Sequence, residues 1–98
     1  MATMIRVSVM YPKGEGATFD LAYYKSTHMP IVEKGMPGVV RTEVDQAIDG
    51  PYLGVGHLYF ESMDAMGAAF GSPGAGEAMA DIPNFTNTTP VMQVAEIL

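Results

Sequence analysis

Alternating side chains mark the first segment of the chain. Over residues 4–11, Ile5, Val7 and Val9 share one parity, whereas polar residues such as Arg6 fall on the other. Because the side chains of a strand point alternately to its two faces, this period of two predicts a β-strand. A loop containing proline and glycine follows and ends the strand.

Three further segments, residues 39–46, 52–60 and 91–98, also have the composition of strands. In the first of them, charged residues alternate with valine and threonine, which predicts one face toward solvent or a polar cavity. In the second, Gly54 and Gly56 fall on the same face. Such spacing indicates either that something packs closely against this face or that the strand bends.

Between the first two strands the spacing of apolar residues is helical. Thr18 is predicted to be the N-cap, and Asp20 then lies in the first turn, where its charge is favourable. Pro30 is expected to kink the helix or to end it near Met29, because proline has no N–H to donate. Helical structure can continue beyond the kink as far as Gly35, a plausible stop.

Helical signals also lie between the third and fourth strands. Ser62 is predicted to cap one helix, and Ser72-Pro73 combines a cap with proline at the first position of a short helix ending near Asp81. The order is therefore β-α-β-β-α-β, which predicts an α+β, ferredoxin-like fold with a four-stranded antiparallel sheet. No linker, repeat or low-complexity tract interrupts it, so residues 1–98 are expected to form a single domain.

The helices of this fold cover only one face of the sheet. Apolar residues at both parities of the first and last strands favour pairing of the other face with a second sheet. Only 16% of the residues are charged and nine are methionine, which also indicates apolar surface covered by another copy of the chain. We therefore expect a homodimer, the alternative being a small domain with an unusually apolar surface.

Charge and composition restrict the other partners. The formal net charge is −6 and the five basic residues are scattered, so neither nucleic acid nor an anionic membrane surface is an expected partner. No window approaches 18 consecutive apolar residues, and residues 1–11 lack the layout of a secretory signal, so a cytoplasmic location is expected. The absence of cysteine excludes disulfides, thiolate metal sites and cysteine nucleophiles.

The candidate chemistry centres on Tyr24 and His28, which are four residues apart and lie on one face of the predicted helix. An imidazole beside a phenol is a reasonable proton-transfer pair, and in an apolar cleft the neutral imidazole can act as a general base. We therefore predict that both residues are catalytic and line the main cavity. The alternative is that His28 is a structural histidine that donates to a backbone carbonyl.

Four other side chains are candidates for substrate binding, namely Tyr11, Tyr23, His57 and Tyr59. Each also has a structural interpretation, because tyrosines are often half-buried and a mid-strand histidine can be a core residue with one hydrogen bond. The charged side chains of residues 41–45 are more typical of a solvated strand face.

Standard cofactor motifs are missing. The sequence has no phosphate-binding loop, no complete dinucleotide fingerprint and no serine-hydrolase elbow. His28 and His57 do not have metal-ligand spacing to each other or to a carboxylate. We therefore expect no metal, flavin, haem or nicotinamide cofactor.

Several of these segments together resemble the EthD family, named after ethyl tert-butyl ether degradation, where such a protein accompanies a cytochrome P450 system. The most specific is residues 23–30, Tyr-Tyr-Lys-Ser-Thr-His-Met-Pro. The others are Tyr11-Pro12, Phe19-Asp20, residues 58–62, Ser72-Pro73 and residues 81–86.

The resemblance implies a dimeric α/β barrel, in which two ferredoxin-like subunits pack sheet on sheet. It also implies an apolar small-molecule ligand in a cleft between helices and sheet, and it maps the recurring histidine of the family onto His28. The wider superfamily includes cofactor-free monooxygenases, polyketide cyclases, muconolactone isomerases, small dehydratases and haem-degrading enzymes. This chain lacks a haem-specific ligand pattern.

Three functions follow as hypotheses. The first is binding of an apolar or aromatic molecule with cofactor-free acid/base or oxygenase-type chemistry, in a degradation or polyketide-like pathway. The second is a non-catalytic ligand-binding or accessory protein of an oxidative degradation system, and the third is a purely structural dimer. A cavity that holds His28 and a second polar group favours the first, a dry cavity without titratable groups favours the second, and the absence of a cavity favours the third.

Overall fold

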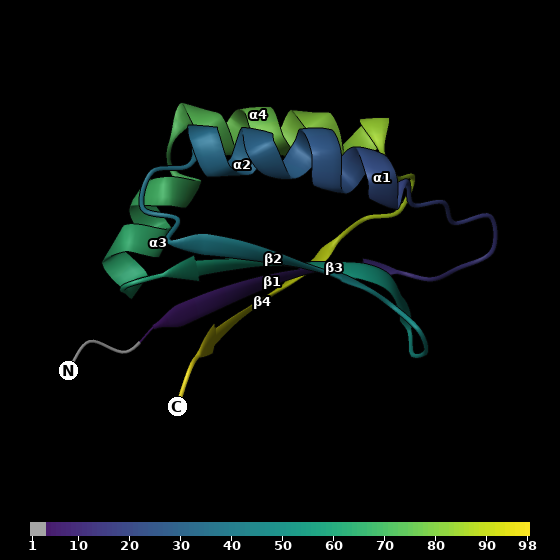
Figure 1. Ribbon diagram of the computed structural model, residues 1–98, viewed down its shortest axis with the longest axis horizontal. Helices are drawn as coiled ribbons and strands as arrows, with labels where there is room; N and C mark the ends of the chain where they lie inside the picture. The colour runs from purple at the N-terminus through teal and green to yellow at the C-terminus, as the bar shows by residue number, and fades with distance from the viewer. Residues whose placement is uncertain (1–3) are drawn as a thin grey trace.

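The computed structural model describes residues 4–98 as two layers, a sheet and a layer of helices (Figure 1). Its elements follow the predicted order along the chain. They are β1 (Ile5–Pro12), α1 (Leu21–Tyr23), a π-helical turn (Tyr24–His28), α2 (Met29–Gly35), β2 (Arg41–Gln46), β3 (Tyr52–Phe60), α3 (Met63–Phe70), α4 (Pro73–Asp81), a 3-10 turn (Ile82–Asn84) and β4 (Val91–Glu96).

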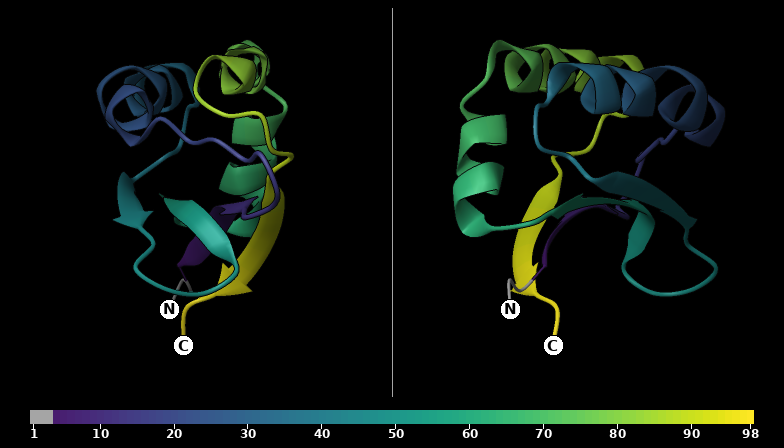
Figure 2. Two further views of the ribbon diagram at one scale, coloured as in Figure 1. Left: turned by 90° about the vertical axis from the view of Figure 1, so that its right-hand side faces the viewer. Right: turned by 60° about the vertical axis from the view of Figure 1, so that its left-hand side comes forward.

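The four strands form one antiparallel sheet in the order β2-β3-β1-β4. Val7 of β1 lies opposite Leu58 of β3 on one side and Val94 of β4 on the other. Helices α2 and α4 run side by side over one face of this sheet, and α3 lies at one end of the molecule (Figure 2). The α+β, ferredoxin-like architecture predicted from the element order is confirmed.

The hydrophobic core fills the space between the helices and the sheet. Val7 and Phe60 are fully buried there, and Val32 from α2 and Ala69 from α3 pack against the same cluster. The predicted bounds of β3 match those observed, whereas two strands are shorter than predicted. β2 begins at Arg41 rather than at residue 39, and β4 ends at Glu96 rather than at residue 98. No helix among residues 4–98 lies over the opposite face of the sheet, which leaves that face open in a single subunit.

The predicted N-cap of the first helix is wrong. Asp20 is the N-cap, and its carboxylate accepts a hydrogen bond of 3.0 Å from the backbone N–H of Tyr23. Thr18 lies outside the helix, where its backbone carbonyl accepts from the Thr86 hydroxyl. Both residue types are good caps, and the pairing of the flanking Phe19 with Thr86 fixes the segment before Asp20 in an extended conformation.

We expected Pro30 to kink the helix or to end it near Met29, and the second of these outcomes is wrong, because helical structure continues past Pro30. The chain instead widens over the π-helical turn Tyr24–His28 and then continues as α2 to the predicted stop at Gly35. A regular α-helix would place the proline ring against the carbonyl of Ser26, and the wider turn removes that clash. The irregular turn therefore carries both predicted catalytic residues, Tyr24 and His28.

Aromatic side chains pack directly on the two glycines of β3. A Cβ atom at Gly54 would lie 3.0 Å from the Phe19 ring, and one at Gly56 would collide with the Tyr24 hydroxyl. Close packing, rather than a bend, is thus the physical reason for both glycines. No helix among residues 4–98 is long and apolar enough to cross a membrane.

Candidate functional site

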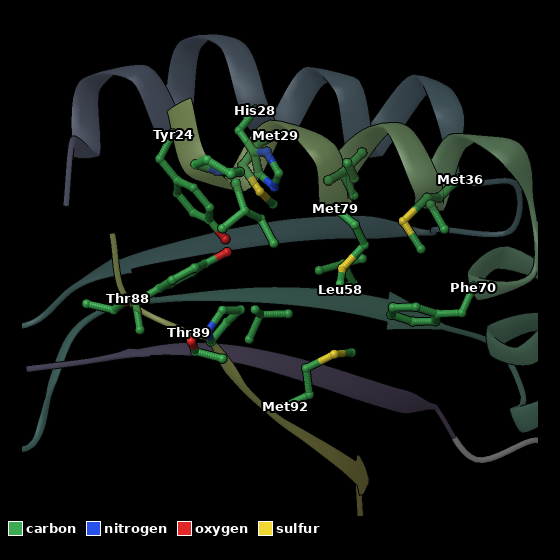
Figure 3. A pocket seen from close by; sticks show the side chains of 18 residues that line it. Tyr24, His28, Met29, Met36, Leu58, Phe70, Met79, Thr88, Thr89 and Met92 are labelled. Atoms are coloured by element: carbon green, nitrogen blue, oxygen red, sulfur yellow. The ribbon is translucent and has the colours of Figure 1, made fainter. Parts of the chain in front are cut away.

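A cavity of about 370 Å³ lies between the helical layer and the covered face of the sheet (Figure 3). Most of its wall is aliphatic or sulfur-containing, including Val32, Met36 and Leu58. Met79 and Met92 also line it and are 59% and 45% exposed, which places them at its mouth. The cavity is therefore an apolar chamber with an opening to solvent.

Three of the six candidate residues line this cavity, namely Tyr11, Tyr24 and His28. Tyr11 reaches it from β1, and the other two project from the π-helical turn. Tyr24 and His28 stack with their ring centroids 5.2 Å apart. The predicted spacing of one helical turn thus brings the phenol and the imidazole together at the same wall.

His57 and Tyr59 were candidates for substrate binding, but they lie on the open face of the sheet and do not line the cavity. Their neighbours Leu58 and Phe60 point toward the helices, so the alternation of the strand directs His57 and Tyr59 away from them. The rings of His57 and Tyr59 are instead part of a polar network on this face.

Each member of that network has a defined partner. The His57 ring lies 2.8 Å from the Ser8 hydroxyl through Nδ1 and 2.7 Å from the Asp45 carboxylate through Nε2. The Tyr59 hydroxyl donates to Glu43, and this bond is the largest cause of the lowered pKa of that carboxyl group. Strand β2 thus turns its charged side chains toward the open face.

Tyr23 does not line the cavity either, but it contacts Asp81, which in turn contacts the cavity-lining residue His28. Its hydroxyl donates a hydrogen bond of 2.7 Å to Oδ1 of Asp81, and this bond is the main cause of the raised pKa of Tyr23. Asn84 donates a second bond of 2.9 Å to the same oxygen. The other oxygen of Asp81 lies 3.0 Å from Nδ1 of His28.

These contacts fix the protonation of the imidazole. Burial raises the pKa of Asp81, but the hydrogen bonds from Asn84, Tyr23 and His28 together outweigh it, and the net pKa is lowered. An ionised carboxylate can only accept, so Nδ1 of His28 carries the hydrogen. Burial lowers the pKa of His28, against the opposing effect of Asp81, so the ring is held neutral. Its Nε2 has no hydrogen-bond partner among residues 4–98.

Asp81 was missed as a site residue in the sequence, although one signal was present. A carboxylate in the last turn of a helix is unfavourable, because the C-terminal end of the helix dipole is negative. Asp81 is the last residue of α4 and is only 8% exposed. A buried acid at that position requires hydrogen-bond donors, and His28, Tyr23 and Asn84 supply them.

The tyrosine hydroxyls form the second polar element of the wall. Burial raises the pKa of Tyr24 to about 12, and a hydrogen bond with Tyr11 opposes this shift. The pKa of Tyr11 is raised by burial first, and then by the charge of Tyr24 and the bond with it. Both phenols are consequently neutral donors over the physiological pH range. Because Gly56 has no side chain, there is room above it for the Tyr24 hydroxyl.

The lining contains no lysine, arginine, aspartate or glutamate among the residues described. Within residues 4–98, no three His, Asp or Glu side chains gather closely enough to hold a metal ion. The chemistry that this wall can perform is therefore proton transfer at the imidazole and hydrogen bonding from the phenols.

Comparison with known proteins identifies the family. Residues 14–89, which include the π-helical turn and Asp81, match the EthD domain. The chain belongs to the EthD family. It is 36% identical over 90 residues to an uncharacterized 11.0 kDa protein in the thcB-thcC intergenic region of Rhodococcus erythropolis, covering 86% of this chain and 85% of that protein.

An EthD-like protein from Ralstonia eutropha JMP134 has the same fold, with a TM-score of 0.89 and 32% identity, over 100% of this chain and 95% of that one. More distant structures share the fold alone. A dimeric ferredoxin-like protein from Thermobifida fusca YX has a TM-score of 0.71 and 14% identity, over 99% and 93% of the two chains. SnoaB from Streptomyces nogalater, a cofactor-independent oxygenase, has a TM-score of 0.62 and 16% identity, over 100% and 97%.

Proposed function

We propose that this EthD-family protein binds an apolar or aromatic small molecule in the cavity and acts on it by cofactor-free acid/base chemistry, with His28 as the base. The observation that carries this proposal is the state of the imidazole. Asp81 holds the hydrogen on Nδ1, and Nε2 is left without a partner in a side chain that lines the cavity. A neutral imidazole with a free ring nitrogen is suited to accept a proton near pH 7.

The wall around His28 supports catalysis more than passive storage. A carrier needs only the apolar lining. Burying the polar pair of His28 and Asp81 costs free energy, because both side chains lose contact with water. Two further donors, Tyr23 and Asn84, hold the Asp81 carboxylate in place. SnoaB is described as a cofactor-independent oxygenase, so chemistry without a cofactor, including oxygenase-type chemistry, is compatible with this fold. A non-catalytic accessory role is the second candidate, because the lining is mostly apolar.

Native mass spectrometry of freshly purified protein tests the binding function. We expect a small molecule that stays bound in the intact protein and is released on denaturation. Ala78, which lines the cavity on α4, offers a matched test, because Ala78→Phe fills the chamber and should abolish retention. Ala80→Phe changes an exposed position of the same helix and should retain the ligand. Equal retention by both variants would place the ligand elsewhere.

We also propose that the protein is a homodimer that pairs through the open face of the sheet. The buried Nε of Arg6 on this face lacks a hydrogen-bond partner among the residues described. Val91 of β4, whose register places it on the same face, is 45% exposed. Covering such groups removes apolar surface from water and provides room for new polar partners. The dimeric Thermobifida protein has the same fold.

Sedimentation at micromolar concentration should therefore give about twice 10.5 kDa. Val91→Glu places a charge on the open face and is expected to produce a monomer, because an unpaired charge is costly to bury at an interface. Ile48→Glu serves as the control, since Ile48 is fully exposed in a turn and should leave the dimer intact. A wild-type monomer would refute this assembly.

A further inference from the structure

We infer that the ligand is a neutral carbonyl compound with an apolar tail, whose oxygen is held by the Tyr24 hydroxyl while Nε2 of His28 removes a proton from the carbon next to the carbonyl. This inference rests on the proposed function and specifies its substrate class and reaction. It assigns Tyr24 a catalytic role distinct from that of His28, as the hydrogen-bond donor for a developing negative charge.

The lining excludes charged ligands. No residue that carries a full charge contributes to the described wall, and His28 is held neutral by burial. Moving a carboxylate or phosphate into such a chamber would remove its hydration without an opposite charge to compensate. A polar but uncharged head group avoids this cost, since the tyrosine hydroxyls and the imidazole can satisfy its hydrogen bonds.

The polar groups lie toward one end of the cavity. In Figure 3, Tyr24, His28 and Thr88 are near one end, whereas Met36 and Phe70 are at the other. A ligand that uses both ends has a polar head near the π-helical turn and an apolar body toward α3. The volume of about 370 Å³ is at the lower end of the range for small-molecule sites, which favours one ring or a medium-length chain.

Tyr24 and His28, two of the polar groups at that end, have complementary roles. Tyr24 lines the cavity beside His28, and their ring centroids are 5.2 Å apart. A neutral phenol hydroxyl can donate a hydrogen bond, so Tyr24 can hold a ligand oxygen. His28, with its hydrogen committed to Asp81, can only accept through Nε2. A ligand that matches both groups has an oxygen that accepts a hydrogen bond beside an atom that gives up a proton.

A carbonyl group with a hydrogen on the adjacent carbon has this arrangement. In the reaction the C–H bond breaks, its proton forms a bond to Nε2 of His28, and its electron pair becomes the carbon–carbon double bond of an enolate. The carbonyl π electrons move onto oxygen, where Tyr24 donates to the new negative charge. Asp81 stabilises the imidazolium that forms. Return of a proton to carbon or oxygen completes the cycle, so no oxidant or reductant is consumed.

Exchange of hydrogen for deuterium in 2-octanone tests this inference directly. In D₂O the wild-type protein should accelerate loss of the α-proton NMR signals, whereas 2-octanol should bind without exchange. Octanoate, which has the same length and a negative charge, should bind at least about 10-fold more weakly. The rate should fall at acid pH, through the lowered pKa of His28, so the acid limb lies below its ordinary value of 6.5.

The variants separate the two roles. His28→Gln should lower the exchange rate about 10²-fold or more, and Tyr24→Phe about 10- to 100-fold, with 2-octanone still bound. Tyr52→Phe is the matched control and should have the wild-type rate, because Tyr52 does not line the cavity. If Tyr24→Phe does not fold, Tyr11→Phe tests the same site, since the Tyr11 ring lies against Tyr24 in the cavity wall and loss of its hydroxyl should lower the rate several-fold.

Failure of this inference differs from failure of the proposed function. Binding of 2-octanone without accelerated exchange, or an unchanged rate in both Tyr24→Phe and Tyr11→Phe, would overturn the carbonyl assignment and leave ligand binding intact. Equal affinity for octanoate would overturn the requirement for a neutral head group. Absence of binding by 2-octanone and 2-octanol alike, with no retained molecule in native mass spectrometry, would contradict the proposed function itself.

Discussion

Substitution of Gly74 by alanine is expected to lower the free energy of unfolding by about 3 kcal/mol. Gly74 is the second residue of α4, and a Cβ atom there would collide with the backbone carbonyl of Gly35 at the end of α2. A backbone carbonyl cannot move aside as the end of a flexible side chain can. The two helices would therefore separate and lose part of their packing over the core.

Gly76→Ala is the matched control in the same helix. A Cβ at Gly76 meets no atom within 4 Å, so this variant gains only the helical preference of alanine, about 0.5–1 kcal/mol of added stability. Denaturant unfolding of both variants measures the two changes with opposite signs. Since α4 carries Asp81, Gly74→Ala should also weaken ligand retention. A Gly74→Ala variant as stable as wild type would show that α2 and α4 do not pack this closely.

The element order was predictable because strand and helix signals in this chain are local. β-Branched residues alternate in β1, and Ser62 accepts a hydrogen bond from the Ala65 N–H as its cap pattern predicts. The cap at Asp20 was not predictable with the same certainty, because Thr18 and Asp20 are both favoured N-caps and only the long-range pairing of Phe19 selects between them.

The candidate site was predictable only in part. Tyr24 and His28 share one helical turn, so their proximity follows from spacing. The orientation of β3 was ambiguous, because aromatic and aliphatic residues occur at both parities and either face could have met the helices. The contact between His28 and Asp81 spans 53 positions of the chain and depends on how α4 lies beside the π-helical turn, which no local pattern encodes.

Asp81→Asn is expected to move the imidazole hydrogen from Nδ1 to Nε2. Oδ1 of Asp81 accepts from both Tyr23 and Asn84, so the carbonyl oxygen of an asparagine would take that position. Its NH₂ group would then occupy the place of Oδ2, 3.0 Å from Nδ1 of His28. Nδ1 must accept from this donor, and Nε2 then carries the hydrogen toward the cavity. A protonated Nε2 cannot act as a base, so exchange in 2-octanone should fall about 10²-fold or more.

Nitrogen-15 NMR of the imidazole ring measures this change without any ligand, because protonated and unprotonated ring nitrogens have distinct chemical shifts. Asp45→Asn is the matched control, since Asp45 contacts His57 on the open face and its loss should leave both the His28 tautomer and the exchange rate unchanged. Binding of 2-octanone should be retained in both variants, because neither carboxylate lines the cavity. If Asp81→Asn keeps the hydrogen on Nδ1 and loses activity nonetheless, Asp81 acts through its charge on the imidazolium rather than by setting the tautomer. If it keeps the wild-type exchange rate, Asp81 does not position the base.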